Sequence, residues 1–472
     1  MAGMCYLCDL EKQEMELKEE FVEMLGQLMP DECEALCRCI GETVPSVSVR
    51  VNEAKGGTVP AGATRVPWCE MGYYLDERPN FTLDPMLHAG RYYVQDASSM
   101  FIHHVIKQLV CPPSPLKGEN SMSQPVKYLD LCAAPGGKTT AALQALPAGS
   151  LVVANEIVPN RARALMDNVM RWGSPHAVVT CNAPAQVGRL THLFDIVAAD
   201  VPCSGEGMMR KDAEAAAQWS PSLVSQCATR QRDIIRDIWP ALRPGGLFIY
   251  STCTYNRQEN EEMIEHLISE YDAEPVAVPV EEAWNIAPAI GCDLPCYRFM
   301  PHRTRGEGLF MAVVRKPEGT RQPLRTKKSA PPKTNAIAQG IKVWLSDCKE
   351  YDLSVQGDDV VANPKTHADA LAALRTTLNV IYSGVTLGTL KGKNCVPHHS
   401  LALSTALNRT ALPHCEVDLD TALRYLHGEA ITIDAPRGYV LLTHHDVPIG
   451  WVNNLGNRAN NLYPKPLRII KN

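Results

Sequence analysis

The stretch Leu129–Ala142, "LDLCAAPGGKTTAA", places an apolar run directly before two adjacent glycines, a lysine and two threonines. Such an apolar run is typical of a buried strand, and "KTTAALQAL", which overlaps its end, has the composition of a helix. Glycines at a strand-to-helix turn let the backbone approach a ligand, because they carry no side chain. The stretch therefore predicts a ligand-binding turn at the carboxyl end of a strand.

Units of strand and helix continue on both sides of this turn. Further apolar strands are predicted in "SLVVANE", "HAVVTCN", "FDIVAAD", "LFIYSTCT" and "GLFMAVVRK", with helical segments such as "NRARALMDNVMRWG" between them. Apolar strands that alternate with helices predict a mainly parallel sheet covered by helices on both faces. We therefore expect an α/β catalytic domain at residues 91–316.

Three further regions flank this domain. Residues 1–90 combine helical spacing in "FVEMLGQLMPDECEALCRCI" with a strand in "VSVRVN", which indicates a small α+β domain. Residues 317–334 are rich in Pro, Lys, Arg and Thr and are interpreted as a basic linker. Residues 335–472 contain a helix followed by an extended segment in "HADALAALRTTLNVIYSGV" and a β-hairpin in "RGYVLLTHHDVPIGWVNN". These form a C-terminal region.

The composition is that of a reduced, cytoplasmic protein. The chain of 472 residues has neither an uncharged apolar run long enough to span a bilayer nor a secretory signal, so we expect no membrane association. Its 17 cysteines are therefore expected to be free thiols. Cys5 and Cys8 form a CxxC pair, but a zinc site needs a second pair at suitable spacing, so no metal is expected.

The net charge of −6 argues against a general nucleic-acid binder. The charge is unevenly distributed, however, because "RKPEGTRQPLRTKKSAPPK", from Arg315 to Lys333, carries seven basic residues and one acidic residue. Local basic segments can attract phosphate even on an acidic protein.

Glycine turns of this kind bind three classes of ligand. A phosphate-binding P-loop requires G-x-x-x-x-G-K-[ST], and Gly137 and Lys138 match its end, but Cys132 occupies the position of its first glycine. A dinucleotide site requires G-x-G-x-x-G, whereas Gly136 and Gly137 are adjacent and follow Pro135. The remaining class is a nucleoside cofactor without phosphates.

Two carboxylates favour that third class. Glu156 ends the second predicted strand, about 20 residues after the glycines, where it would accept hydrogen bonds from both ribose hydroxyls. Asp200 ends the fourth predicted strand beside the same crevice. S-adenosylmethionine fits this pattern, and the alternative is that both acids simply end strands in solvent.

Two cysteines follow predicted strands in the same way. Cys203 lies in "ADVPCSGEG" and Cys253 in "YSTCTYNRQEN". Because parallel strands end at one edge of a sheet, we expect the two thiols to lie near each other and near the cofactor. A lone cysteine at a strand end is usually a buried hydrophobe, whereas two at one active edge favour nucleophilic chemistry.

That chemistry suits methylation of a pyrimidine. Carbon 5 of cytosine is a poor nucleophile until a thiolate adds to carbon 6, and a thiolate both adds and leaves easily. A carboxylate such as Asp200 can hold the exocyclic amine and ring nitrogen 3, and a second thiol can assist elimination. The target base must leave its stack to be reached.

Three motifs, "DLCAAPGGKT", "DVPCSGEGMMRKD" and "STCTYNRQENE", resemble the signature motifs of the NOL1/NOP2/Sun family of RNA cytosine-C5 methyltransferases. Within that family, "RYYVQDASSM", "PHRTRGEGLF" and "PIGWVNNLGNRANNLYPKPLRI" are most similar to segments of the bacterial RsmF-type enzymes that act on 16S ribosomal RNA. The resemblance covers nearly the whole chain. It implies a Rossmann-like class I S-adenosylmethionine-dependent methyltransferase core, with a small α+β domain before it and a PUA-like RNA-binding domain after it.

The resemblance also implies roles for individual residues. It makes Cys253 the nucleophile, Cys203 the thiol that aids product release, and Asp200 the acid before that motif. It assigns cofactor binding to Glu156, to Asp200 and to the loop residues Cys132, Ala133, Ala134, Pro135, Gly136, Gly137 and Lys138. The family often carries an acid near the adenine, where this chain has "TCNAPAQ"; Asn182 can hydrogen-bond an adenine, but Ala183 cannot.

Basic residues in two loops are candidates for RNA binding. Arg210 and Lys211 lie in "MMRKD", and His302, Arg303 and Arg305 lie in "PHRTRGEG". Contact with the RNA backbone is the functional interpretation, and a solvated loop or an exposed turn is the alternative. Asn457, Arg458 and Lys465 are further candidates in the C-terminal region, where incidental polar residues on strands are nearly as good an interpretation.

We therefore expect a monomeric enzyme that uses S-adenosyl-L-methionine to methylate carbon 5 of a cytosine in ribosomal RNA, with ribosomal RNA or the small ribosomal subunit as its partner. Two alternatives stay open. One is a non-catalytic RNA-binding factor for ribosome assembly, and the other is methylation of transfer RNA by the same chemistry. The sequence does not specify which cytosine is modified.

Overall fold

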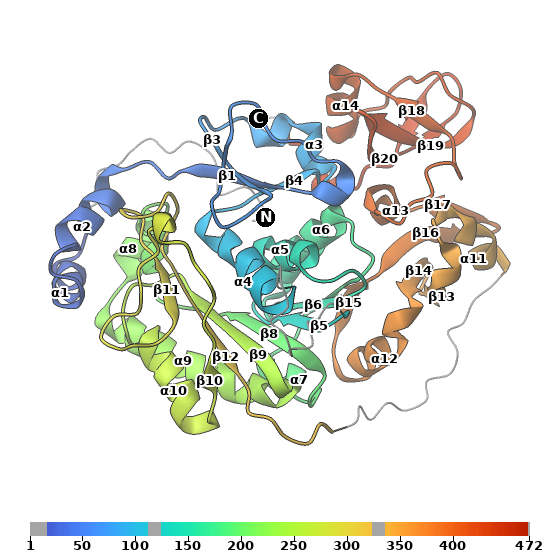
Figure 1. The fold of residues 1–472 in the computed structure, drawn as a ribbon. Coiled ribbons are helices and arrows are strands. Elements are labelled where there is room, and N and C mark those ends of the chain that lie inside the picture. Colours follow the sequence, from blue (N-terminus) through green and yellow to red (C-terminus); the bar gives the residue numbers. More distant parts are fainter. Residues whose placement is uncertain (1–16, 112–123, 323–335, 471–472) are drawn as a thin grey trace.

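A computed structural model describes residues 17–111, 124–322 and 336–470 (Figure 1). Cys5 and Cys8, and residues 323–334 of the expected linker, lie outside these described residues. In the described part the strands form one large sheet and three four-stranded sheets. None of the helices in that part is both long enough and apolar enough to cross a membrane.

The large sheet has nine strands in the order β10-β12-β9-β8-β5-β6-β7-β15, with β11 paired to β12. Neighbours from β9 to β7 run parallel, whereas β12 and β15 are antiparallel to the strands they pair with. The strands are β5 Lys127–Asp130, β6 Leu151–Asn155, β7 Ala177–Thr180, β8 Phe194–Asp200, β9 Leu242–Thr252, β10 Glu274–Pro275, β11 Cys296–Phe299, β12 Leu309–Arg315 and β15 Val380–Ser383. The expected α/β fold with a mainly parallel sheet is confirmed.

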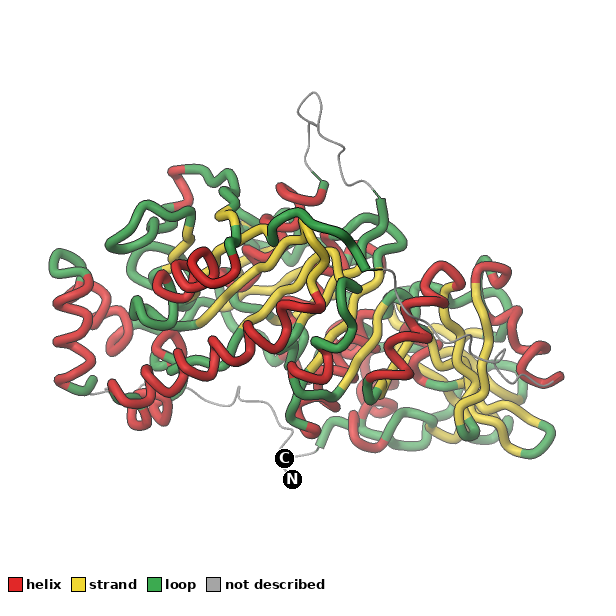
Figure 2. The backbone as a smooth tube through the Cα atoms, turned by 90° about the horizontal axis from the view of Figure 1, so that it is seen from below, coloured by secondary structure: helices red, strands yellow, loops and turns green. Residues whose placement is uncertain are grey.

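Helices cover both faces of this sheet, and the strands are apolar for that reason (Figure 2). Along β5, Tyr128 packs with residues of α4 and α5, and Leu129 packs on the opposite face with residues of α9 and α10. Full burial of a side chain such as Leu129 stabilises a fold by about 1.5–3 kcal/mol. The covering helices are α4 Phe101–Val110, α5 Gly137–Ala145, α6 Pro159–Trp172, α7 Pro184–Val187, α9 Pro221–Ile238 and α10 Glu261–Tyr271.

Strand β5 lies at the centre of the sheet, between β6 and β8. The chain passes from β5 to β6 and β7 on one side and then returns to β8 and β9 on the other. Ligands of open α/β sheets bind outside the carboxyl ends of the strands at such a reversal of strand order. The strand order therefore predicts a ligand site at the carboxyl ends of β5, β8 and β9.

The N-terminal region combines a helical pair with a small sheet of order β2-β3-β1-β4. Its elements are α1 Glu19–Leu28, α2 Cys33–Glu42, β1 Val47–Val51, β2 Thr64–Arg65, β3 Gly72–Leu75, α3 Pro85–His88 and β4 Tyr92–Val94. The buried Arg50 on β1 donates to Gln144 Oε1 on α5 at 2.6 Å and lies over the ring of Trp172 on α6. This sheet is thus docked on the helices that follow the glycine turn.

The C-terminal region contains two sheets, of order β13-β14-β16-β17 and β18-β19-β20-β21, beside the main sheet (Figure 2). Strands β19 and β20 form the expected hairpin. The elements are α11 Ala336–Gly340, β13 Tyr351–Gln356, β14 Asp359–Pro364, α12 Ala368–Thr377, β16 Val385–Lys391, β17 Asn394–Pro397, α13 His399–Leu403, β18 His414–Glu416, α14 Leu419–Leu426, β19 Gly438–His444, β20 Val447–Asn454 and β21 Ala459–Asn461.

One part of the C-terminal region belongs spatially to the catalytic sheet. After β14 the chain forms α12, whose Leu371 and Leu374 are buried in the core beneath the main sheet, and then β15 pairs with β7 at the edge of that sheet. The chain returns to the C-terminal sheet at β16. The sequence predicted the helix and the extended segment but not the pairing of that segment with β7, because the residue pattern of a strand does not indicate which strand it pairs with. The boundary at residue 335 stays a prediction.

Candidate active site

A cavity of about 190 Å³ lies at the carboxyl end of β5. Asp130 at the end of β5, the loop after it and Asp200 at the end of β8 contribute part of its lining, and the rest comes from β4 of the N-terminal sheet and the residues just after it. Its lining consists of Tyr93, Val94, Gln95, Asp96, Ser99, Asp130, Cys132, Ala133, Ala134, Pro135, Gly137, Lys138 and Asp200. All of the predicted loop residues except Gly136 are in this lining.

The glycine pair shapes the turn between β5 and α5. Gly136 has a φ of +112°, a conformation that favours glycine, and it immediately precedes the first residue of α5. A Cβ atom on Gly137 would lie 3.4 Å from the side chain of Gln95 and 3.5 Å from that of Tyr93. The loop therefore packs closely against the N-terminal side of the cavity, and sequence reasoning did not find Tyr93 or Gln95.

Asp130, the last residue of β5, is a buried acid that sequence reasoning also missed. Its Oδ2 accepts a hydrogen bond from Thr139 Oγ1 at 2.6 Å. Burial raises the pKa of Asp130 to about 7, and the nearby Asp200 carboxylate adds to this effect. The signal available in the sequence was its position at the end of the strand, directly before the glycine loop.

Lys138 and Asp200 form an ion pair at the cavity, with 2.9 Å between Lys138 Nζ and Asp200 Oδ2. Ser251 Oγ on β9 donates to the other oxygen of Asp200 at 2.7 Å. Burial opposes the charge of Lys138, but the attraction of Asp200 outweighs it, so the pKa of Lys138 is raised. The Asp200 side chain remains 36% exposed, which leaves it open to a substrate.

The two predicted cysteines meet beside this pair. Cys203 follows β8, Cys253 follows β9, and their Sγ atoms lie 3.1 Å apart. The backbone N–H of Cys253 also donates to Cys203 Sγ at 3.4 Å. The hydrogen bond with Cys253, together with burial, raises the pKa of Cys203 well above its usual range. Cys203 is therefore held as a protonated thiol at neutral pH, and the expected proximity of the two thiols is present.

Glu156 follows β6 and is almost fully buried. Its Oε1 accepts from the backbone N–H of Val158 at 3.0 Å, and Arg161 Nη1 lies 3.5 Å from its Oε2. The carboxylate thus stands at the start of α6, outside the lining of the cavity. A ribose contact of Glu156 stays a prediction.

Asn182, beyond the end of β7, is engaged within the protein. Its Oδ1 accepts from the backbone N–H of Asn379 at 3.0 Å, and its Nδ2 donates to the Asn379 carbonyl at 3.3 Å. The side chain therefore joins the end of β7 to the residue before β15. Contact of Asn182 with an adenine stays a prediction. The hydrogen bonds to Asn379 give the same side chain a structural role instead.

The basic residues predicted to bind RNA lie where the N-terminal region meets the catalytic domain. Arg210 donates to both carboxylate oxygens of Glu307, at 2.7 and 2.9 Å, and Lys211 Nζ lies 3.3 Å from the same group. The Arg210 side chain is only 6% exposed. Arg210 thus has a structural partner, and RNA contact through Arg210 and Lys211 stays a prediction.

The second basic loop has partners of the same kind. His302 Nε2 lies 2.7 Å from Glu32 Oε2, and Arg303 forms two hydrogen bonds to the same carboxylate. Arg305 lies over the ring of Tyr74, 4.4 Å from its centroid. The sequence contained the cations but did not indicate that Glu32, some 270 residues earlier, is their partner.

Within residues 17–111, 124–322 and 336–470, no three His, Cys, Asp or Glu side chains are grouped so as to hold a metal ion.

Comparisons with known proteins agree with the resemblance carried by the three motifs. The family profile described as 16S rRNA methyltransferase RsmB/F matches residues 120–315. Residues 17–97 match the N-terminal domain of 16S rRNA methyltransferase RsmF, and residues 413–469 match the methyltransferase RsmF PUA domain.

Relatives of known name match much of the chain. The chain is 29% identical over 485 residues to ribosomal RNA small subunit methyltransferase F of Shewanella loihica, with 96% of each chain covered. It is 35% identical to the protein of the same name from Klebsiella pneumoniae, over 54% of this chain and 52% of that one.

Solved structures share the fold. A methyltransferase homologue from Pyrococcus horikoshii has a TM-score of 0.52 at 25% identity and covers 63% of this chain and 95% of its own. NSun6 from the same organism, solved with SFG, an S-adenosylmethionine analogue, has a TM-score of 0.53 at 19% identity and covers 64% and 99%.

Proposed function

Because the chain belongs to the RsmB/F family of 16S rRNA methyltransferases, we propose that it transfers a methyl group from S-adenosyl-L-methionine to carbon 5 of a cytosine in small-subunit ribosomal RNA. The observation that carries the proposal is the separation of 3.1 Å between the Cys203 and Cys253 sulfurs, beside the Lys138–Asp200 pair. A thiol pair at the edge of a methyltransferase sheet supports addition of sulfur to the target base.

The cavity residues suit the proposed cofactor. The backbone of the loop from Cys132 to Lys138 lies open to the cavity because its residues are mostly small, and Asp130 and Asp200 present carboxylates to a ligand that carries positive charge. Glu156, at the end of the neighbouring strand, is assigned to the ribose hydroxyls. When bound there, S-adenosylmethionine supplies an electrophilic methyl group.

The residues of the chain then divide the work on the base. The Cys253 thiolate forms a bond to carbon 6 of cytosine, and the electron pair of the 5,6 double bond is drawn toward carbon 5, which becomes nucleophilic. Asp200 holds the exocyclic amine and nitrogen 3 side of the ring, and Lys138 keeps that carboxylate in place. After methyl transfer, a water molecule takes the carbon 5 proton, the electron pair of that C–H bond re-forms the 5,6 double bond, and the bond between the Cys253 sulfur and carbon 6 breaks. Cys203, held protonated, assists this release by donating to the departing Cys253 sulfur.

RNA binding is assigned to the flanking regions. The N-terminal region and the PUA domain at residues 413–469 would hold the ribosomal RNA, while residues 91–316 bind the cofactor and react. Proposed RNA contacts are Arg210, Lys211, His302, Arg303 and Arg305. At all of them except Arg305, phosphate would have to compete with Glu32 or Glu307. We propose that the enzyme acts as a monomer in the cytoplasm.

The test is transfer of a tritiated methyl group to three substrates: naked 16S ribosomal RNA, assembled small subunits from a strain that lacks the enzyme, and transfer RNA. We expect incorporation into ribosomal RNA, as 5-methylcytosine that bisulfite sequencing locates. Incorporation into transfer RNA alone would replace the proposed substrate. Binding to RNA with no incorporation into any of the three would favour a non-catalytic assembly factor.

A further inference from the structure

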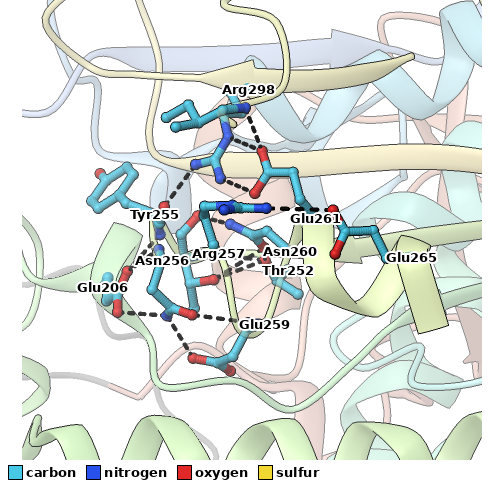
Figure 3. A network of polar contacts seen from close by, with 12 residues as sticks. Glu206, Thr252, Tyr255, Asn256, Arg257, Glu259, Asn260, Glu261, Glu265 and Arg298 are labelled. Atoms are coloured by element: carbon cyan, nitrogen blue, oxygen red, sulfur yellow. Dashed lines mark hydrogen bonds and ion pairs between the residues drawn. The ribbon is translucent and has the colours of Figure 1, made fainter. Parts of the chain in front are cut away.

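Two buried carboxylates, Glu206 and Glu259, lie on the two loops that carry the thiols, one on each loop, and Figure 3 shows both carboxylates. Glu206 follows Cys203 in the loop after β8, and Glu259 follows Cys253 in the loop after β9. Both have no exposed surface. Burial of a carboxylate is costly unless its oxygens are well hydrogen-bonded. The hydrogen-bond partners of Glu206 and Glu259 therefore show which parts of the chain the two acids hold in place.

Glu259 holds the loop of the other cysteine. Its Oε2 accepts from the backbone N–H of Ser204, the residue after Cys203, at 3.0 Å, and its Oε1 accepts from the Ser204 hydroxyl. Gln231 on α9 donates to Oε2 at 2.7 Å and also to the carbonyl of Pro202 at 3.0 Å. Glu259 therefore holds both chain neighbours of Cys203: it binds Ser204 directly and Pro202 through Gln231.

Glu206 does the reverse. Its Oε2 accepts from the backbone N–H groups of Tyr255 and Asn256, at 2.5 and 3.0 Å, two and three residues beyond Cys253. Trp219 Nε1 donates to Oε1 at 3.0 Å, which anchors the carboxylate from behind. The loop that carries Cys203 thus holds the loop that carries Cys253.

The two carboxylates also share donors. Asn256 Nδ2 donates to Glu206 at 2.7 Å and to Glu259 at 2.9 Å, as Figure 3 shows. In the described part of the chain neither carboxylate forms an ion pair with a Lys, Arg or His side chain. Neutral donors from the two cysteine loops, with Trp219 and Gln231, therefore hold both acids. This differs from Glu261, two residues after Glu259, which pairs with Arg298.

From this reciprocal arrangement we infer that Glu206 and Glu259 are positioning residues that set the separation of the two thiols, and through it the balance between adduct formation and product release. The inference rests on the proposed thiol mechanism. Each carboxylate fixes the backbone beside the other loop's cysteine, so the loss of one acid shifts one sulfur relative to the other. A displacement of about 1 Å at a reacting group can slow a step by about a hundredfold.

The two acids should therefore fail in different ways. Glu259→Gln replaces one accepting oxygen with an NH2 group that faces hydrogen-bond donors, which weakens the hold on the backbone beside Cys203, the release thiol, so the methylated adduct should persist. We expect the SDS-stable protein–RNA complex, relative to methyl transferred, to increase about tenfold over the unsubstituted enzyme. Glu206→Gln likewise places an NH2 group against hydrogen-bond donors and weakens the hold on the backbone beside Cys253, so single-turnover methyl transfer should fall about tenfold without accumulation of adduct.

Asp195→Asn is the matched control. Asp195 is a largely buried carboxylate at the opposite end of β8, where it pairs with Arg243, and it touches neither cysteine loop. All variants are compared per folded protein, measured by thermal melting. Glu259→Asp, which keeps the charge but withdraws it from Ser204 by one methylene, is the second variant if Glu259→Gln does not fold, and it should raise the ratio of adduct to product in the same direction.

The same experiment separates two kinds of failure. If the unsubstituted enzyme transfers no methyl group, or Cys203→Ala traps no adduct, the proposed function fails. If those two behave as expected but the glutamate variants keep the unsubstituted ratio of adduct to product, or lose activity only in proportion to stability as Asp195→Asn does, the positioning role is wrong.

Discussion

The sulfur of Cys203 lies 3.1 Å from the sulfur of Cys253, although 50 residues separate them in the chain. The contact arises because β8 and β9 are parallel neighbours whose carboxyl ends point into one crevice. The hydrogen bond to Cys253, together with burial, raises the pKa of Cys203 well above its usual range. One thiol stays protonated beside the other.

The different roles proposed for the two thiols predict opposite behaviour of two alanine variants. Cys253→Ala should abolish methyl transfer and form no covalent RNA complex, because the nucleophile is gone. Cys203→Ala should transfer the methyl group once and then remain bound to RNA. Gel electrophoresis in SDS with labelled RNA distinguishes them, and an adduct in Cys253→Ala rather than Cys203→Ala would exchange the two roles.

The Lys138–Asp200 pair predicts a loss in the chemical step. Lys138→Met leaves the Asp200 carboxylate without its cation, and Asp200→Asn removes the carboxylate that accepts from the exocyclic amine of the base. Each should lower kcat by about a hundredfold or more, since groups that position or protonate a reacting base contribute on this scale. Lys138→Arg should recover part of the loss. If the single-turnover rate constant of Lys138→Met equals that of the unsubstituted enzyme, the pair has no part in the chemical step.

Cofactor affinity tests Glu156 against Asn182. Glu156→Gln keeps an oxygen that can accept from Val158 but weakens acceptance from ribose hydroxyls, so the Kd for S-adenosylmethionine should rise about tenfold. Asn182→Ala leaves the backbone N–H of Asn379 without its acceptor and should cost about 1–2 kcal/mol of stability. Calorimetric titration decides whether Asn182 also binds cofactor: an increase in Kd as large as that of Glu156→Gln would support the adenine contact.

Glu32 predicts a pH-dependent attachment of the N-terminal helices. Its hydrogen bond with Arg303, assisted by His302, lowers the pKa of Glu32 to about 2. An acid whose folded pKa is lowered stabilises the fold above its unfolded pKa, near 4.5, and that contribution is lost as the pH falls toward 2. Glu32→Gln should cost about 0.5–1 kcal/mol at pH 7, the range of a partly exposed ion pair. Urea unfolding should show a smaller difference in the free energy of unfolding between Glu32→Gln and the unsubstituted protein at pH 3.5 than at pH 7.

His103 predicts a pH effect in the same direction by another cause. Burial on α4 lowers its pKa to about 3, so between pH 6.5 and 3 the unfolded chain binds a proton that the folded protein refuses. Acidification from pH 7.5 to 5 should therefore cost about 2 kcal/mol at this site. His103→Leu should reduce the loss of stability over that interval. The exposed His414, replaced by Gln, is the control, and equal slopes for the two variants would refute the assignment.

The sequence predicted those parts of the site that depend on strand order. Cys203, Cys253 and Asp200 follow strands of one parallel sheet, so their convergence follows from topology. Glu32 and Glu307 were missed because their partners lie far away in the chain and no periodicity links them. Tyr93 and Gln95 were missed for a related reason: they reach the cavity only because Arg50 docks the N-terminal sheet on the catalytic helices.

Because β15 pairs with β7, the C-terminal region also covers the edge of the catalytic sheet. Strand β7 has β6 on one side and β15 on the other, and the backbone of Asn379 satisfies Cys181 and Asn182 just beyond it. A fragment that ends at residue 316 would leave β7 as an open edge strand of buried, apolar residues. Such edges recruit strands from other chains, so that fragment should aggregate through β7 even with every proposed catalytic residue intact.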